Sequence, residues 1–171
     1  MKILKYISIF ILFIGAGYYG LVFMAPKSIE FQVNEDFDAP IDKVFQMVAN
    51  PAKLTQWNST MDKVTYGGKY PLMVGDKYEI YFKGDQPLIL SRTVQGFDQN
   101  HRLVTHGIIP NYFVWNEDIR FEALDSTHTR IFTKITLKSE SLRTRLLMYA
   151  KETHEKNVSQ NYQKLKKVLK R

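Results

Sequence analysis

The chain has 171 residues, of which 44% are hydrophobic and 13% aromatic. This length and composition exclude a disordered protein and suit one domain with a buried core. The chain contains no cysteine, which excludes disulfide bonds, thiolate zinc sites and cysteine nucleophiles. Its net charge of +7 would suit nucleic acid or anionic lipid, but the basic residues are spread out except in the C-terminal KLKKVLKR. That run is typical of the solvated face of a terminal helix, with membrane-surface contact as the next alternative and nucleic-acid binding the last. We expect a monomer with no nucleic-acid partner.

The first segment of the chain is strongly apolar. Residues 6–26 carry no charge, and a bilayer core requires about 20 apolar residues. The pattern predicts a transmembrane anchor over residues 1–27, followed by a ligand-binding domain over residues 28–171. A cleaved signal peptide is the alternative, because the small residues 15–17 could form a cleavage site and the product would then be secreted.

Lysines flank this segment on both sides. Lys2 and Lys5 precede it and favour a cytoplasmic N-terminus, which predicts a single-pass protein with its domain on the periplasmic or extracellular side. Lys27 follows the segment and weakens this asymmetry.

Alternating apolar residues predict about seven β-strands in the rest of the chain. In SIEFQVNEDF, for example, Ile29, Phe31 and Val33 share one face. The other expected strands cover residues 63–70, 76–82, 88–97, 102–109, 112–124 and 129–137. Turn signals such as GG, DQN, IPN and DST separate them, so neighbouring strands should pair antiparallel.

Two short helices are expected after the first strand. Residues 42–48 place apolar side chains on one side, at the spacing of a buried helical stripe. A second helix should begin at once, with Asn50 as its cap and Pro51 at its first position. Trp57 then points inward, as a core or pocket-rim residue.

A helical period begins at Glu140 and continues nearly to the last residue. One stripe of this helix holds Leu147, His154, Asn161 and Leu165, and the helix would be roughly 45 Å long if unbroken. It is the element large enough to cover the apolar face of the sheet. A curved sheet around one helix predicts an internal pocket, and a solid aromatic core is the alternative.

The stretch DAPIDKVFQMVANPAKLTQWNS, residues 38–59, resembles the START/Bet v 1-like superfamily (SRPBCC), in particular its polyketide cyclase/dehydrase and lipid-transport branch. TVQGFDQNHRLV and NYQKLKKVLKR are similar to further parts of that pattern, and the resemblance covers about residues 29–171. It implies an α+β helix-grip fold, with a curved antiparallel sheet around the long C-terminal helix. It specifies an activity poorly, because the matching residues are packing residues and turns.

Three charged residues share strand faces with apolar neighbours and are predicted to face inward: Glu35, Arg92 and Glu117. Arg92 could pair with one carboxylate, and the other could meet His154 or Asn161. These four candidates, Glu35, Arg92, Glu117 and His154, would suit a cyclase, dehydratase or hydrolase that transfers protons. The alternative is that the three charges are solvated or structurally paired and that His154 belongs to the core or the pocket wall.

Aromatic side chains populate the expected strands and the last helix. An apolar cavity with a few polar groups is how small hydrophobic ligands are usually held. The predicted ligand-binding residues are Trp57, Tyr78, Phe82, Phe113, Trp115, Phe121, Tyr149, His154 and Asn161. We therefore favour membrane-tethered binding of a lipid or other hydrophobic small molecule, with the enzyme as the alternative.

No cofactor or metal is expected. His101, His106 and His128 lie in or near turns and strands without ligand spacing. The sequence also lacks a Gly-rich phosphate loop, a His-Glu zinc motif and a GxSxG motif.

Overall fold

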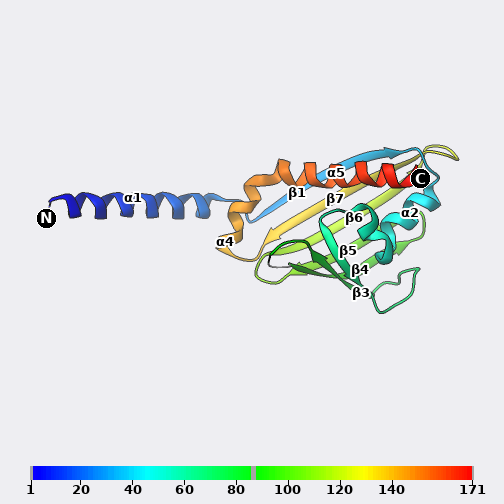
Figure 1. Ribbon diagram of the computed structural model, residues 1–171, viewed down its shortest axis with the longest axis horizontal. Helices are drawn as coiled ribbons and strands as arrows, with labels where there is room; N and C mark the ends of the chain where they lie inside the picture. The colour runs from blue at the N-terminus through cyan, green and yellow to red at the C-terminus, as the bar shows by residue number, and fades with distance from the viewer. Residues whose placement is uncertain (1, 86–87, 171) are drawn as a thin grey trace.

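The computed structural model describes residues 2–85 and 88–170, which form one antiparallel sheet and the helices around it (Figure 1). The strand order is β1-β7-β6-β5-β4-β3-β2. The strands are β1 (Ser28–Phe37), β2 (Met61–Thr65), β3 (Lys77–Phe82), β4 (Ile89–Asp98), β5 (Arg102–Ile109), β6 (Phe113–Ala123) and β7 (Thr129–Ser139). The predicted seven-strand antiparallel sheet is thus confirmed.

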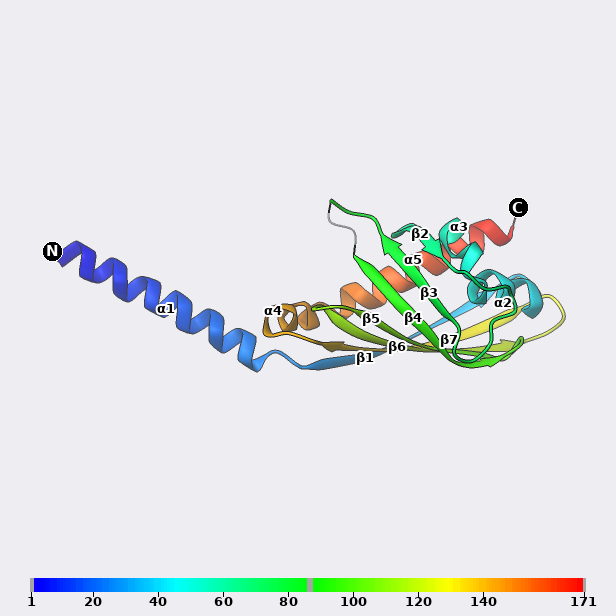
Figure 2. The ribbon, with the colours of Figure 1, turned by 90° about the horizontal axis from the view of Figure 1, so that it is seen from below.

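Alternation along the strands gives the sheet one buried face and one polar face. In β7, Ile131, Ile135 and Leu137 are at most 1% exposed, whereas Phe132 and Lys134 between them are exposed. Burial of such apolar side chains stabilises the fold by about 1.5–3 kcal/mol each. The helices that follow β1 and the C-terminal helix lie on the buried face (Figure 2).

The tandem helices expected between the first two strands are present as α2 (Ile41–Ala49), η1 (Pro51–Lys53) and α3 (Leu54–Trp57). The Asn50 side chain accepts a hydrogen bond of 3.1 Å from the Ala52 amide and so caps η1 as predicted. Trp57 is 7% exposed, and its indole N–H donates to the Met47 carbonyl at 2.9 Å. Its ring stacks on Tyr162, which joins these helices to the last one.

The predicted long C-terminal helix is present, but it is not one unbroken α-helix. It consists of α4 (Leu142–Arg145), η2 (Leu146–Ala150) and α5 (Lys151–Leu169). The Ser141 side chain caps α4, and the Thr144 hydroxyl donates to the Tyr112 carbonyl at 3.1 Å, which holds the first turn at the end of the sheet. The backbone then leaves α-helical geometry at Ala150, with ψ of 31°. The covering helix is therefore α5, about 28 Å long for its 19 residues.

α5 lies across the sheet and along β1, which gives the helix-grip arrangement implied by the resemblance (Figure 1). Tyr162 and Leu165 of α5 are buried against the sheet. Phe37 of β1 contacts Tyr162 edge-on, with their ring centroids 5.9 Å apart. The long C-terminal helix and the sheet together form the hydrophobic core.

α1 (Lys2–Met24) extends away from the domain (Figure 2). Near its C-terminal end, Val22 is buried, and the Tyr149 hydroxyl donates to the Leu21 carbonyl at 3.3 Å. Within residues 2–85 and 88–170, no helix combines the length and apolar character needed to cross a bilayer. The span expected over residues 6–26 is therefore not supported.

Candidate functional site

A cavity of about 390 Å³ lies between the covered face of the sheet, α3 and α5. Most of its walls are apolar, and the residues that keep solvent contact at its mouth include Thr60, Phe82, Leu88 and Asn157. Its lining consists of Val48, Leu54, Trp57, Asn58, Thr60, Met61, Phe82, Leu88, Arg92, Leu103, Ile109, Phe113, Trp115, Glu117, Ile119, His154, Asn157, Val158, Asn161 and Tyr162.

Arg92 and Glu117 are the charged pair on the cavity floor. Their side chains are 8% and 10% exposed, and Arg92 Nη1 lies 2.7 Å from Glu117 Oε2. The two residues belong to β4 and β6, which are separated by β5, and Gly107 of β5 lies beside Arg92 and Trp115. A Cβ at Gly107 would come within 3.3 Å of Arg92 Cγ, so the glycine makes room for the arginine to cross β5.

The guanidinium group is held in its charged form. Burial alone would lower the pKa of Arg92, but attraction to Glu117 and to Tyr78 outweighs it and raises that pKa. The guanidinium carbon also lies 5.8 Å from the centre of the Trp115 ring, a cation–π contact. Burial raises the pKa of Tyr78, which keeps its phenol neutral next to the arginine.

The surroundings of this ion pair contain unsatisfied polar atoms. Among the described residues, Arg92 Nε, Thr105 Oγ1 and Trp115 Nε1 are buried without a hydrogen-bond partner. Thr105 lies beside Glu117 in the β5–β6 pairing, and Trp115 contacts Arg92. All three atoms therefore lie close to the Arg92–Glu117 ion pair. Such atoms are rare in native proteins and call for an explanation.

His154 and Asn161 reach the cavity from α5. The His154 ring stacks on Phe31 with centroids 6.4 Å apart, and its Nε2 lies 3.4 Å from the Leu147 carbonyl. Asn161 is 8% exposed and brings an amide to an otherwise apolar wall. The structure thus places Arg92, Glu117 and His154, three of the four candidate catalytic residues, around one cavity.

Glu35 lies elsewhere. Its carboxylate accepts hydrogen bonds from Ser159 at 2.7 Å, Gln163 at 3.1 Å and Lys166 at 2.6 Å. Burial would raise the pKa of Glu35, but the hydrogen bonds from Lys166 and Ser159 outweigh it and lower that pKa. The expectation that Glu35 could share a pocket with His154 or Asn161 is wrong, because β1 is an edge strand and Glu35 meets the polar side of α5 instead.

Six of the nine predicted ligand-binding residues line the cavity: Trp57, Phe82, Phe113, Trp115, His154 and Asn161. The other three do not. Tyr78 is buried beside Arg92, Phe121 packs against Phe45 with ring centroids 4.8 Å apart, and Tyr149 is 55% exposed. Sequence reasoning missed the aliphatic wall, including Leu103, Ile119 and Val158, because inward aliphatic residues look alike whether they pack against protein or line a space.

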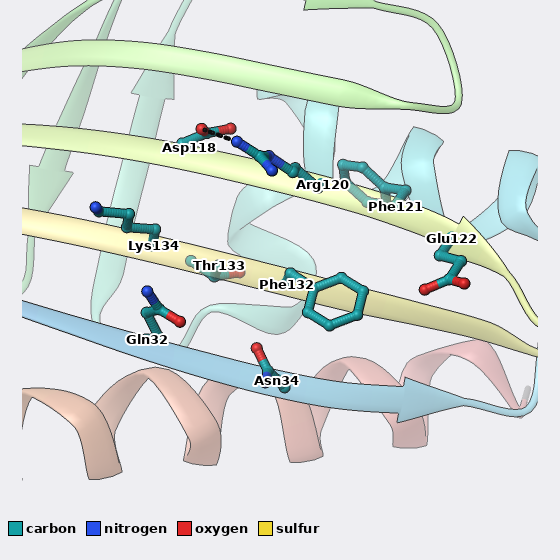
Figure 3. A pocket seen from close by; sticks show the side chains of 9 residues that line it. All are labelled: Gln32, Asn34, Asp118, Arg120, Phe121, Glu122, Phe132, Thr133 and Lys134. Carbon is teal, nitrogen blue, oxygen red and sulfur yellow. Dashed lines mark hydrogen bonds and ion pairs between the residues drawn. The ribbon is translucent and has the colours of Figure 1, made fainter.

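A larger hollow of about 600 Å³ lies on the uncovered face of the sheet, over β1, β6 and β7 (Figure 3). Three of its charged groups are paired on the surface, Asp118 with Arg102 and Arg120, and Lys134 with Glu30. Exposed pairs of this kind are typical of a solvated sheet face. The apolar cavity between the sheet and α5 is therefore the candidate binding site.

No group of three or more His, Asp or Glu side chains within the described residues is arranged to hold a metal ion.

A protein-family model described as Activator of Hsp90 ATPase homolog 1-like protein matches residues 38–170. Among curated proteins, no sequence matches this chain. Solved structures are similar in fold, including a START superfamily protein from Mycobacterium smegmatis, with 13% identity, 82% of this chain and 97% of that chain covered, and a TM-score of 0.64.

Two further structures have the same fold. A protein from Arthrobacter aurescens has 18% identity, with 82% of this chain and 86% of that chain covered and a TM-score of 0.62. Ara h 8.0201 has 11% identity, with 81% and 98% covered and a TM-score of 0.58. At these identities the likeness shows the fold alone. The family-model match together with this fold supports the predicted START/Bet v 1-like superfamily. The polyketide cyclase/dehydrase and lipid-transport branch stays a prediction.

Proposed function

Because the chain belongs to the Activator of Hsp90 ATPase homolog 1-like family, and because its fold forms a largely apolar cavity, we propose that it binds a lipid or other hydrophobic small molecule there. The observation that carries this proposal is the cavity itself, about 390 Å³ with Trp57, Phe82, Phe113 and Trp115 in its walls. Small-molecule sites are concave and mostly apolar, with a few polar groups that orient the ligand. Arg92, Glu117 and Asn161 would be those groups.

The proposal is tested by filling the cavity. Val158 is half-buried on α5 and lines the cavity, so Val158→Phe places additional atoms in the binding space. Val168→Phe is the matched control, since Val168 is also half-buried on α5 and packs against the same core but does not line the cavity. Titration of the full chain with an uncharged apolar fluorophore should show binding by the natural protein and by Val168→Phe, and at least ten-fold weaker binding by Val158→Phe. Equal binding by all three, or by none, would count against the proposal.

We also propose that α1 attaches the domain to a membrane. The support is the uncharged run of residues 6–26 together with the exposed side chains of α1, of which Phe10, Ile11 and Phe13 are more than 60% exposed. Burying such side chains in lipid would be favourable by about 25 cal/mol per Å². The cytoplasmic N-terminus and the periplasmic or extracellular domain stay predictions.

Vesicle flotation tests the attachment. The full chain should float with phosphatidylcholine vesicles, and Ile11→Asp/Ile14→Asp should remain at the bottom of the gradient. Val74→Asp is the control, because Val74 is an equally exposed apolar residue in a loop of the domain. Flotation of the double variant at the level of the natural protein would argue against α1 as the attachment.

An enzyme of the cyclase, dehydratase or hydrolase class is the second candidate, because Arg92, Glu117 and His154 line one cavity. General acid–base catalysis by histidine usually needs a carboxylate to orient the ring. Glu117 is already paired with Arg92, and within the described residues no carboxylate pairs with His154. Binding is therefore favoured. If the natural protein turned over a hydrophobic substrate and His154→Gln did not, the result would favour the enzyme.

A further inference from the structure

The ion pair on the cavity floor leaves much of its hydrogen-bonding capacity unused. A guanidinium has five N–H donors and a carboxylate has two acceptor oxygens. Arg92 and Glu117 meet through one close contact, between Nη1 and Oε2. Both residues line the cavity, so their remaining donors and acceptor positions face the space that a ligand would occupy.

Buried ion pairs are stable only when further hydrogen bonds satisfy their remaining donors and acceptors. The protein supplies few of these bonds here. Arg92 Nε and the nearby Trp115 Nε1 are buried without a partner among the described residues. Because Arg92 and Glu117 both line the cavity, a ligand there can add to these bonds by accepting from the exposed part of the guanidinium and donating to the Glu117 carboxylate.

The lining also limits the charge of such a ligand. Arg92 and Glu117 are its two permanently charged residues, and their charges cancel. A carboxylate or an amine in this apolar cavity would add a third, uncompensated charge, which is strongly unfavourable. The polar group of the ligand is therefore uncharged.

The volume limits its size. At about 30 Å³ for each water-sized group, 390 Å³ holds roughly a dozen non-hydrogen atoms. A two-chain phospholipid is several times larger than this, whereas a single medium-length chain fits.

On the basis of the proposed function, we infer that the cavity takes an uncharged single-chain molecule whose polar group both donates and accepts hydrogen bonds, as a carboxamide or an alcohol does. This group contacts Glu117 and Arg92, and the chain extends toward the mouth at Phe82 and Leu88.

Four probes of nearly equal size test the inference on the full chain: decanamide, undecanone, decanoate and undecane. Decanamide donates and accepts, undecanone only accepts, decanoate is charged, and undecane has no polar group. Titration calorimetry, or displacement of the apolar fluorophore, should show decanamide binding at least ten-fold more tightly than undecanone. That is the smallest gain expected from one hydrogen bond to a charged group.

Glu117→Gln gives a second, independent readout. This substitution keeps the shape of residue 117 but leaves the Arg92 charge unpaired, so decanoate should gain at least ten-fold and become the preferred probe. Phe82→Leu is the control, because Phe82 lines the mouth without a polar group and its change should weaken all four probes similarly. The wild-type series carries the test alone if Glu117→Gln does not fold.

The possible failures are distinguishable. If undecane and undecanone bind but decanamide binds no more tightly than undecanone, the inference is overturned and the proposed function stands. If decanoate binds most tightly to the natural protein, the inference that the polar group of the ligand is uncharged is overturned, and the proposed function again stands. If none of the four binds, the inference and the proposed function fail together.

Discussion

Arg92 reaches Glu117 across an intervening strand, with 2.7 Å between Nη1 and Oε2. The contact links β4 to β6, which are not hydrogen-bonded to each other. It also places two opposite charges in the wall of an apolar cavity, where each depends on the other for its stability.

Arg92→Met should lower the free energy of unfolding by about 3 kcal/mol, because it leaves Glu117 buried without its partner. The double variant Arg92→Met/Glu117→Met should recover most of this loss, since it removes both charges. Urea denaturation of the single and double variants measures the coupling. Arg102→Met is the control, because the Arg102–Asp118 pair is more exposed and its loss should cost under about 1 kcal/mol. If the double variant lost as much free energy of unfolding as the two single variants together, this account would be contradicted.

Gly107→Ala should destabilise the domain by about 1–3 kcal/mol. The added Cβ would lie 2.6 Å from Leu90 Cδ1 and 3.3 Å from Arg92 Cγ, and Leu90 is fully buried and has little room to move. Gly67→Ala is the matched control, because a Cβ there meets nothing within 4 Å. Thermal unfolding of the two variants compares them directly, and equal melting temperatures would show that Leu90 and Arg92 adjust without cost.

Strand alternation was enough to predict that Arg92 and Glu117 face the buried side of the sheet. It could not predict which inward residues border the cavity, because that depends on position across the sheet. Glu35 has the same inward parity, but it lies on the edge strand and meets Lys166 of α5. Tyr78 lies beside Arg92 in the β3–β4 pairing and is buried, but it does not line the cavity.

The break in the C-terminal helix shows a second limit of local patterns. The helical period after Glu140 is continuous in sequence, and the segment contains no proline or glycine. The first turn is separated from α5 by tertiary contacts, chiefly the Thr144 hydroxyl on the Tyr112 carbonyl and the burial of Met148. Local propensity carries no information about partners that are distant in sequence.

Trp57→Phe should reduce the free energy of unfolding by about 1–2 kcal/mol. The phenyl ring can still stack on Tyr162, but the hydrogen bond from the indole to the Met47 carbonyl is lost, and that carbonyl is buried. Trp115→Phe is the matched control, because its indole nitrogen has no partner among the described residues. Urea denaturation should show a larger loss for Trp57→Phe than for Trp115→Phe, and the reverse order would refute the role assigned to the Met47 contact.

Glu35→Gln should make the stability of the domain less sensitive to acid. Although burial opposes it, the hydrogen bonds from Lys166 and Ser159 lower the pKa of Glu35 in the folded state. A carboxylate with a lowered pKa stabilises the fold fully above its unfolded pKa, near 4.5, and loses this contribution as the pH falls through the folded value. The natural protein should therefore lose more stability between about pH 6 and pH 3 than Glu35→Gln.

Lys166→Met tests the cause of this pH dependence. It removes the strongest hydrogen-bond donor to Glu35, at 2.6 Å, and leaves the carboxylate in place. Its stability should also fall less steeply with acid, because the folded and unfolded pKa values of Glu35 become more similar. Urea denaturation at a series of pH values measures all three proteins. If the natural protein and both variants lose stability in parallel, the acid sensitivity of the fold has its origin in other carboxylates.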